Sequence, residues 1–153
     1  MASWAAVPSV LFLWATWPML TAALGVIRAW DFQYKTAAFL WAKPTKNGSG
    51  WAFGNGYWTP ANTEPCLLAT RGQCGRLRLP RSIRQLIIVP RGGHSQKPDE
   101  VYRRIEALVP GPYLELFARG RRLGWDSWGD EVDSGPGARR WPSWDYPRPA
   151  EAP

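Results

Sequence analysis

The sequence predicts an α/β fold, in which short buried strands are interleaved with two helices. Five apolar runs have the length and composition of strands that are covered on both faces. Two further stretches repeat apolar side chains at helical spacing. Strands and helices mixed along one chain are the pattern of an α/β protein, and 153 residues allow one core.

The N-terminal part, Ala5–Ile27, is a mostly apolar run. Pro8 and Pro18 interrupt it, and no Lys or Arg precedes it, which argues against a membrane span and a signal peptide. We therefore expect a buried strand at Val10–Trp14, a turn at Thr16–Pro18 and a helix from about Pro18 to Trp30. The inner face of this helix would consist of Leu20, Ala23, Leu24 and Ile27. A membrane-anchored N-terminus is the alternative.

Three more strands are expected in the middle of the chain. Lys35–Ala42 reads as the second buried strand, and the Gly-, Lys- and Asn-rich segment 43–55 after it reads as a mobile loop. Glu64–Thr70 is the third strand, which ends at Arg71-Gly72. Gln85–Val89 is the fourth.

A basic segment separates the third strand from the helix that follows. From Pro65 to Pro98 there is no Asp or Glu, and the segment contains six arginines. Arginines near aromatic residues are a plausible footprint for a phosphate backbone. The candidate nucleic-acid contacts are Arg71, Arg76, Arg78, Arg81 and Arg84. A solubilising loop of a basic protein, whose net charge is +7, is the alternative reading.

The stretch Lys97–Glu131 predicts a helix, a turn, a strand and a basic loop. Pro98 suits the first helical position, because the N–H that it lacks would be unpaired there. The apolar stripe Val101, Ile105 and Leu108 gives the helix one core-facing side. Pro110-Gly111-Pro112 ends the helix.

The strand expected after that turn, Tyr113–Ala118, carries one carboxylate, Glu115. A buried carboxylate is costly unless a partner neutralises it, and the strand ends at an arginine-rich loop. Because ligands in open α/β sheets bind beyond the carboxyl ends of strands, a small-molecule site is one reading. A surface edge strand with Glu115 in solvent is the other.

The two cysteines, Cys66 and Cys74, are too few for a disulfide framework and lack the spacing of a zinc site. Cys66 lies in an apolar run, where we expect it to be buried. Nothing in this cysteine content requires an oxidising compartment, so the cytoplasm is the expected location. Beyond Val132 the composition changes to Gly, Pro, Arg and Trp without periodicity, which predicts a domain over residues 1–132 and a disordered tail over 133–153.

Three segments together resemble one known family. They are GNGYWTPANTEPCLLATRG (54–72), HSQKPDEVYRRIEAL (94–108) and YLELFARGRRLGWDSWGDE (113–131). In this order they are similar to the family of the seventy-kilodalton mRNA adenosine-N6 methyltransferase subunit, particularly its bacterial and phage members. The opening LFLWATWPML also resembles the strand and helix that follow the family's catalytic motif. The resemblance implies a Rossmann-like fold that uses S-adenosylmethionine to methylate adenine N6.

The resemblance also implies roles for individual residues. By motif position, the residues on the side of the cofactor S-adenosylmethionine are Lys97, Glu115, Phe117, Arg119, Arg121, Asp130 and Glu131. The residues on the side of the target base are Tyr57, Trp58, Asn62 and Glu64. An arginine can hold a carboxylate in a directed way, and aromatic rings can stack on an extruded base.

Three departures from the family pattern bear on activity. Pro60 stands where bacterial members often have Arg, and Asp130 stands where the family usually has Asn. The family's catalytic motif, Asp-Pro-Pro-Trp or a near variant, is absent, since these 153 residues contain no Asp-Pro-Pro. Methyl transfer needs the acceptor held close and aligned, so we expect no catalytic residue and no useful catalysis. The strand that carries this motif would be central, so we expect an empty slot and exposed strand edges.

The sequence thus favours an N-terminally truncated adenine-N6 methyltransferase homologue that keeps the cofactor half and is inactive alone. DNA is the more favoured nucleic acid, with RNA as the alternative. The second hypothesis is a non-catalytic nucleic-acid-binding subunit that supports a catalytic partner chain. A small membrane-anchored protein is the third, and we expect no membrane association.

Overall fold

The structure, a computed structural model, describes residues 5–54, 56–79, 82–93, 96–129 and 131–132. The chain divides into two compact units, Met1–Gly111 and Pro112–Pro153, and the division falls in the Pro110–Pro112 turn. The α/β class is confirmed, because both strands and helices are present. The predicted domain limit at residue 132 stays a prediction, and the expected tail at 133–153 lies outside the described residues.

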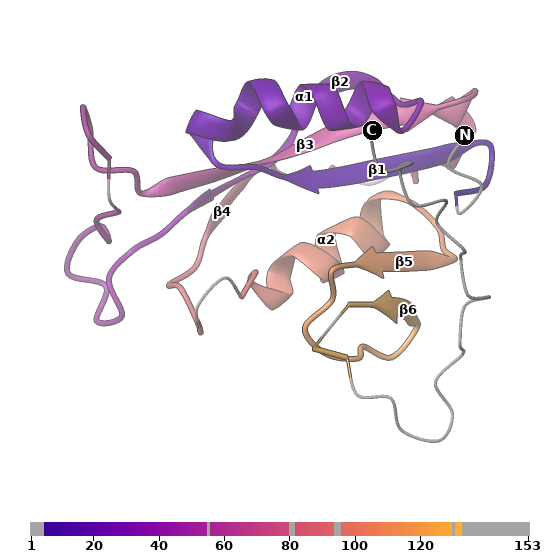
Figure 1. Ribbon diagram of the computed structural model, residues 1–153. Coiled ribbons are helices and arrows are strands. Elements are labelled where there is room, and N and C mark those ends of the chain that lie inside the picture. The colour runs from indigo at the N-terminus through magenta and orange to yellow at the C-terminus, as the bar shows by residue number, and fades with distance from the viewer. Residues whose placement is uncertain (1–4, 55, 80–81, 94–95, 130, 133–153) are drawn as a thin grey trace, which may run out of the picture. The chain divides into compact units, whose positions relative to one another are not determined.

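The first unit contains a four-stranded sheet whose order is β1-β3-β2-β4 (Figure 1). These strands are β1 (Ser9–Trp14), β2 (Gln33–Ala42), β3 (Thr63–Arg71) and β4 (Leu86–Ile88). They confirm the four apolar runs predicted in this part of the chain. The sheet is mixed, because β3 is antiparallel to β1 and β2 while β4 is parallel to β2.

Helix α1 (Leu20–Ala29) covers one face of this sheet and follows the short 3-10 turn η1 (Trp17–Met19) (Figure 1). Its predicted inner face is confirmed, since Ala23 and Ile27 are buried and Leu20 and Leu24 pack partly buried beside them. The same cluster contains Phe32, Leu67 and Ala69. Within the described residues, no helix has both the length and the apolar character needed to cross a membrane.

The other face of the sheet is lined by aromatic rings. Phe12 and Phe39 stack with ring centroids 6.1 Å apart, and Trp14 meets Trp41 edge to face at 6.3 Å. Cys66 of β3 lies in register with Trp14 and with Phe39, and it is fully buried, as predicted. The sheet is therefore apolar on both faces, which explains why its strands read as continuous apolar runs.

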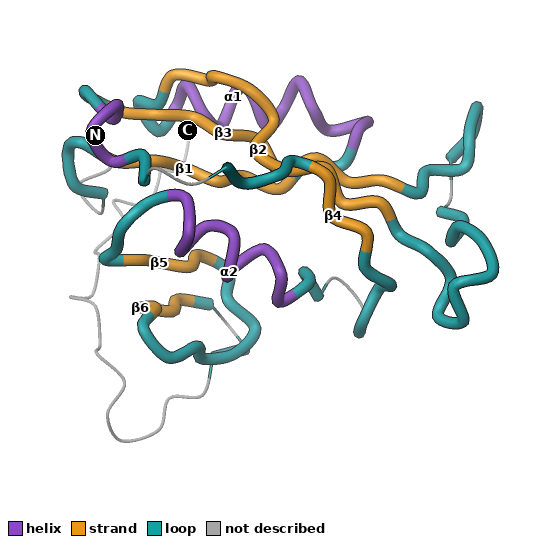
Figure 2. The backbone as a smooth tube through the Cα atoms, turned by 180° about the vertical axis from the view of Figure 1, so that it is seen from behind, coloured by secondary structure: helices purple, strands orange, loops and turns teal. Residues whose placement is uncertain are grey.

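Helix α2 (Asp99–Leu108) lies on the side of the sheet opposite α1, as both views show (Figures 1 and 2). Val101 and Ile105 are buried, which confirms the predicted stripe. Arg104 ties the helix to the start of β4, because its Nη1 donates to the carbonyl oxygens of Arg84 and Leu86 at 2.6 and 2.8 Å. Pro98 is the N-cap and not the first helical residue, because its ψ of 141° is extended.

Two loops of the first unit have more structure than the sequence predicted. The segment between β2 and β3 contains an antiparallel bridge between Pro44 and Trp51 and a turn at Gly48, whose φ is +69°. The basic segment after β3 contains a 3-10 turn, η2 (Cys74–Leu77). Short polar stretches of this kind carry no periodicity that a sequence pattern could detect.

The second unit contains a parallel pair of strands, β5 (Tyr113–Leu116) and β6 (Trp125–Trp128). The predicted strand Tyr113–Ala118 was too long and is half-buried instead of buried, because Phe117 leaves the extended conformation with φ +59°. β6 was not predicted, since its four residues, Trp-Asp-Ser-Trp, place two polar residues between two aromatic ones and form no apolar run. Among the described residues, β1 pairs only with β3 and β5 only with β6, so each of these strands has one edge without a partner strand. A complete Rossmann-like sheet stays a prediction.

Candidate functional site

The carboxyl ends of three strands meet at one edge of the sheet in the first unit. β1 and β2 are both antiparallel to β3 and hence parallel to each other, and β4 is parallel to β2. β3 begins at the same edge with Thr63 and Glu64. This is the edge at which open α/β sheets bind ligands.

Three charged side chains converge there, and we call Lys43, Glu64 and Lys97 the charged triad. Lys43 follows β2, Glu64 is the second residue of β3, and Lys97 precedes α2. Lys97 Nζ lies 2.6 Å from Glu64 Oε2, and Lys43 Nζ pairs with Glu64 Oε1. Each lysine therefore holds a different oxygen of one carboxylate, whose side chain is 18% exposed.

The triad keeps Glu64 ionised. Burial alone raises the pKa of this carboxyl, but hydrogen bonds and positive charge from Lys43 and Lys97 outweigh burial and leave the pKa below its ordinary value of 4.5. At neutral pH Glu64 is therefore a carboxylate, which can accept hydrogen bonds and cannot donate them.

Two tryptophan rings form the walls beside the triad. Lys97 Nζ lies 5.2 Å from the ring centroid of Trp14 and 5.9 Å from that of Trp41, and Lys43 Nζ lies 4.6 Å from Trp41. Cation–π attraction of this kind stabilises the ammonium groups near the rings. The Trp41 indole is itself oriented, because its Nε1 donates to the carbonyl oxygen of Val89 at 2.7 Å.

Sequence reasoning identified Glu64 and Lys97 but missed Lys43, Trp14 and Trp41. The two tryptophans looked like ordinary strand residues, although Trp14 is the last residue of β1 and Trp41 the second-last residue of β2. That position is the signal that could have found them, together with the lysine that follows Trp41 by two residues.

Cys66, two residues after Glu64, is no candidate nucleophile. Its burial raises the pKa of the thiol to about 12, against the opposing charge of Lys97. The group is consequently protonated at neutral pH, and a thiolate is the reactive form of cysteine. We interpret Cys66 as a packing residue between Trp14 and Phe39 on the aromatic face of the sheet.

The other residues predicted for the target-base side lie on the loop between β2 and β3. The carbonyl oxygen of Asn62 accepts a hydrogen bond from the Lys43 amide at 2.9 Å, so Asn62 stands next to the triad in the backbone ladder. Tyr57 and Trp58 are exposed, and their rings meet edge to face at 5.7 Å.

Apart from Lys97, the residues predicted to bind the cofactor belong to the second unit, where those described lie in β5 and in the segments after β5 and β6. Glu115 is half-buried in that strand, Phe117 is exposed, and Arg121 lies exposed in the loop. Arg119 Nε donates to both carboxylate oxygens of Glu131, at 2.9 and 3.1 Å. Asp130 lies outside the described residues.

The loop beyond β5 is closed tightly against the end of β6. The Ala118 amide donates to the Trp128 carbonyl at 2.9 Å. A Cβ atom on Gly129 would lie 2.2 Å from the Ala118 carbonyl oxygen, so only glycine fits there. These contacts fix the backbone at Ala118, which lies between Phe117 and Arg119.

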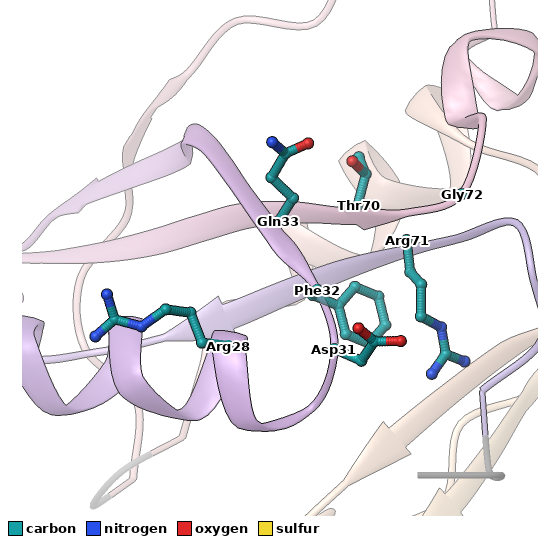
Figure 3. A pocket seen from close by; sticks show the side chains of 7 residues that line it. All are labelled: Arg28, Asp31, Phe32, Gln33, Thr70, Arg71 and Gly72. Atoms are coloured by element: carbon teal, nitrogen blue, oxygen red, sulfur yellow. The ribbon is translucent and has the colours of Figure 1, made fainter. Parts of the chain in front are cut away.

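The arginines predicted to bind nucleic acid have different surroundings. Arg76, Arg78 and Arg84 are exposed, and Arg81 lies outside the described residues. Arg71 is half-buried, with its guanidinium 5.1 Å from the Phe32 ring and hydrogen-bonded to the carbonyl oxygens of Ala5 and Ala6. It lines an open cavity of about 470 Å³ together with Arg28 and Asp31 (Figure 3). This cavity adjoins the end of β3, whereas the charged triad lies at its beginning.

The sheet is mixed, and charged and aromatic side chains lie at the edge where open α/β sheets bind ligands, so the candidate site is placed as in ligand-binding α/β proteins. Comparison with known proteins gives the family: residues 2–131 match MT-A70, and the chain belongs to the MT-A70 family. This membership confirms the resemblance identified from the three sequence segments.

Individual relatives agree with this membership. The chain is 37% identical over 124 residues to the type II methyltransferase M.MunI of Mycoplasma sp, covering 80% of this chain and 50% of that protein. It is 27% identical over 132 residues to the N(6)-adenosine-methyltransferase catalytic subunit METTL3 of Homo sapiens, covering 80% of this chain and 22% of that protein. The chain thus spans half the length of M.MunI and less of METTL3.

Proposed function

We propose that this chain is the methyl-donor-binding part of an S-adenosylmethionine-dependent adenine-N6 methyltransferase that acts on nucleic acid. The observation that carries the proposal is the pairing of Lys97 with Glu64 at the carboxyl edge of the sheet, 2.6 Å apart. The sequence had assigned one of them to the cofactor and the other to the target base. Because a residue assigned to the cofactor contacts a residue assigned to the target base, this pair marks where the methyl donor and the acceptor would meet.

The residues present fit S-adenosylmethionine. Arg119 is partly exposed and already holds a carboxylate, that of Glu131, so it can hold the carboxylate of the methionine part. Glu131 is an exposed acceptor suited to ribose hydroxyls. Phe117 presents an exposed ring from a left-handed backbone position, and such positions concentrate where ligands bind.

When bound, S-adenosylmethionine supplies a methyl group on a positively charged sulfur. In the proposal, Arg119 and Arg121 orient the carboxylate of the methionine part, and Glu115 and Glu131 accept from the amino group of the methionine part and from the ribose hydroxyls. Lys97, in the first unit, is assigned to the cofactor by its motif position alone. Asp130 would contribute beside the adenine of the cofactor.

On the acceptor side, the proposal assigns Tyr57 and Trp58 to the target base. Their exposed rings can stack on it. Glu64, held as a carboxylate by the triad, can accept from the exocyclic amine, and Asn62 lies beside it. DNA is the proposed nucleic acid in preference to RNA, since the three motif segments resemble bacterial and phage members of the family in particular.

Donor binding is tested by isothermal titration of the full chain with S-adenosylmethionine. Arg119→Ala and Lys97→Ala should each raise Kd by about tenfold or more, because a hydrogen bond to a charged group is worth roughly 1.5–3 kcal/mol. Arg103→Ala is the matched control, since Arg103 is an exposed arginine of α2. Unchanged affinity in both site variants would remove these residues from the site, and no heat of binding in the parent chain would refute the donor assignment.

A second function, a nucleic-acid-binding subunit that supports a catalytic partner, is favoured by the exposed Arg76, Arg78 and Arg84 in a segment without acidic residues. Arg71 and Arg81 complete the proposed contact set. The donor titration separates the two functions, because a subunit that only binds nucleic acid needs no donor site. For either function we propose a cytoplasmic location, where two free cysteines, Cys66 and Cys74, stay reduced.

A further inference from the structure

The loop between β2 and β3, residues 43–62, carries four large aromatic side chains that the core does not use. Their exposed fractions are 47% for Trp51, 77% for Phe53, 96% for Tyr57 and 91% for Trp58. Tyr57 and Trp58 meet edge to face with ring centroids 5.7 Å apart, so these two form one exposed aromatic surface, and exposed apolar surface marks an interaction site. We call these four residues the aromatic loop set.

The backbone that carries these rings is held by specific hydrogen bonds. The Ala52 amide donates to the Lys43 carbonyl at 2.8 Å, and the Thr45 amide donates to the Gly50 carbonyl at 2.8 Å. Asn47 Oδ1 accepts from the Thr45 and Ser49 hydroxyls, both at 2.8 Å. The first half of the loop is therefore an ordered hairpin-like turn, and Trp51 lies on its returning segment, opposite Pro44.

The second half of the loop doubles back on itself. A Cβ atom on Gly54 would lie 2.4 Å from the Ala61 carbonyl oxygen, and one on Gly56 would lie 1.8 Å from that of Thr59. Only glycine permits these approaches, and they place Tyr57 and Trp58 at the tip of a tight turn. Because this tight turn depends on glycine at two positions, we infer that it serves to hold the rings of Tyr57 and Trp58 exposed.

The composition of the loop favours nucleic acid over protein or lipid as the binding partner of these rings. Residues 43–62 contain no Leu, Ile, Val or Met, so the large apolar side chains of the loop are all flat aromatic rings. From residue 32 to residue 63 there is no Asp or Glu, whereas the loop has Lys43 and the exposed Lys46. Flat rings beside positive charge are the combination that binds unpaired bases on a phosphate backbone.

The loop also starts and ends at the candidate site. Lys43 opens it and belongs to the charged triad, and Asn62 closes it by accepting from the Lys43 amide at 2.9 Å. A strand stacked on the loop would therefore run directly past Glu64.

We propose that the aromatic loop set is a stacking platform for single-stranded nucleic acid, so that this chain prefers unpaired polynucleotide to duplex. The proposal rests on the proposed function for its choice of nucleic acid, and it adds the strand form and two residues, Trp51 and Phe53. It requires neither a bound methyl donor nor an adenine, because every base has a face on which a ring can stack.

The test uses fluorescence anisotropy with the full chain and a labelled oligothymidylate, which contains no adenine. The parent chain should bind it more tightly than a duplex of equal length. The double variants W51A/F53A and Y57A/W58A should each raise Kd by about tenfold or more, since stacking on one ring contributes at least a severalfold factor. The loss should persist at high salt, because stacking releases no counterions.

Two controls give the result its meaning. Tyr34→Ala removes an exposed ring from the start of β2, away from the loop, and should leave Kd unchanged. W51F and W58F keep a ring at each position and should restore most of the affinity. Equal binding of single strand and duplex, or parent-like binding by both double variants, would overturn the proposal.

Binding to anionic lipid vesicles in place of the oligonucleotide would also overturn it. Failure of the proposed function would look different, as absent binding of S-adenosylmethionine with oligothymidylate binding intact.

Discussion

At the scale of single residues, Glu64 is the side chain whose surroundings say most about the site. Two lysines from different elements hold its two oxygens, and two tryptophans border the lysines. A carboxylate that is mostly buried would cost free energy if it were unpaired, and the triad offsets that cost. Glu64 thus links the stability of the sheet edge to the chemistry proposed for it.

The triad makes stability depend on pH in a defined direction. The pKa of Glu64 is lowered on folding, so its stabilising contribution is fully present above 4.5 and is lost as pH falls through the lowered value. Glu64→Gln should reduce the free energy of unfolding by about 1–3 kcal/mol at neutral pH, and this deficit should shrink in acid. Urea titrations at several pH values measure it. Glu106→Gln, an exposed change on α2, is the control, and a deficit independent of pH would contradict the assignment.

At the scale of elements, the end of α1 has a cap that the sequence does not announce. Asp31 has φ +63°, its amide donates to the Arg28 carbonyl at 3.0 Å, and the Phe32 amide donates to the Ile27 carbonyl at 2.9 Å (Asp31 and Phe32 are shown in Figure 3). This is the Schellman pattern, in which glycine is usual at the left-handed position. The strand and helix positions could be predicted from apolar periodicity, whereas this cap could not, because aspartate stands where the rule expects glycine.

The cap predicts a stabilising substitution. Asp31→Gly should raise the free energy of unfolding by roughly 0.5–1 kcal/mol, because relief of the left-handed conformation exceeds the added freedom of the unfolded chain. Asp31→Ala should lower it, since alanine tolerates this conformation less well than aspartate. Thermal melting of the three proteins decides it, and an alanine variant as stable as the glycine variant would refute the strained cap.

At the scale of the whole molecule, the chain combines MT-A70 membership with the absence of an Asp-Pro-Pro sequence in its 153 residues. In the proposed function the triad and the Arg119–Glu131 pair supply polar contacts for ligands, and the expected lack of the family's catalytic motif stays a prediction. A chain without a group to align the acceptor amine would lose the gain from proximity and orientation.

The chain by itself should therefore transfer no labelled methyl group from S-adenosylmethionine to adenine-containing DNA or RNA. M.MunI methyltransferase, assayed in parallel, is the positive control for substrate and donor. Incorporation of label above background by the purified chain would contradict the catalytic argument and would direct attention to Glu64.

The sequence by itself determined the α/β class, the first four strands, both helices and the family, because apolar periodicity and contiguous motifs are local properties. It also predicted Glu64 and Lys97 as site residues, though on separate sides of the reaction. Only the tertiary structure decided that Glu64 pairs with both Lys97 and Lys43, beside Trp14 and Trp41. These residues are up to 83 positions apart, from Trp14 to Lys97, and their meeting follows from strand order and register, which no local pattern encodes.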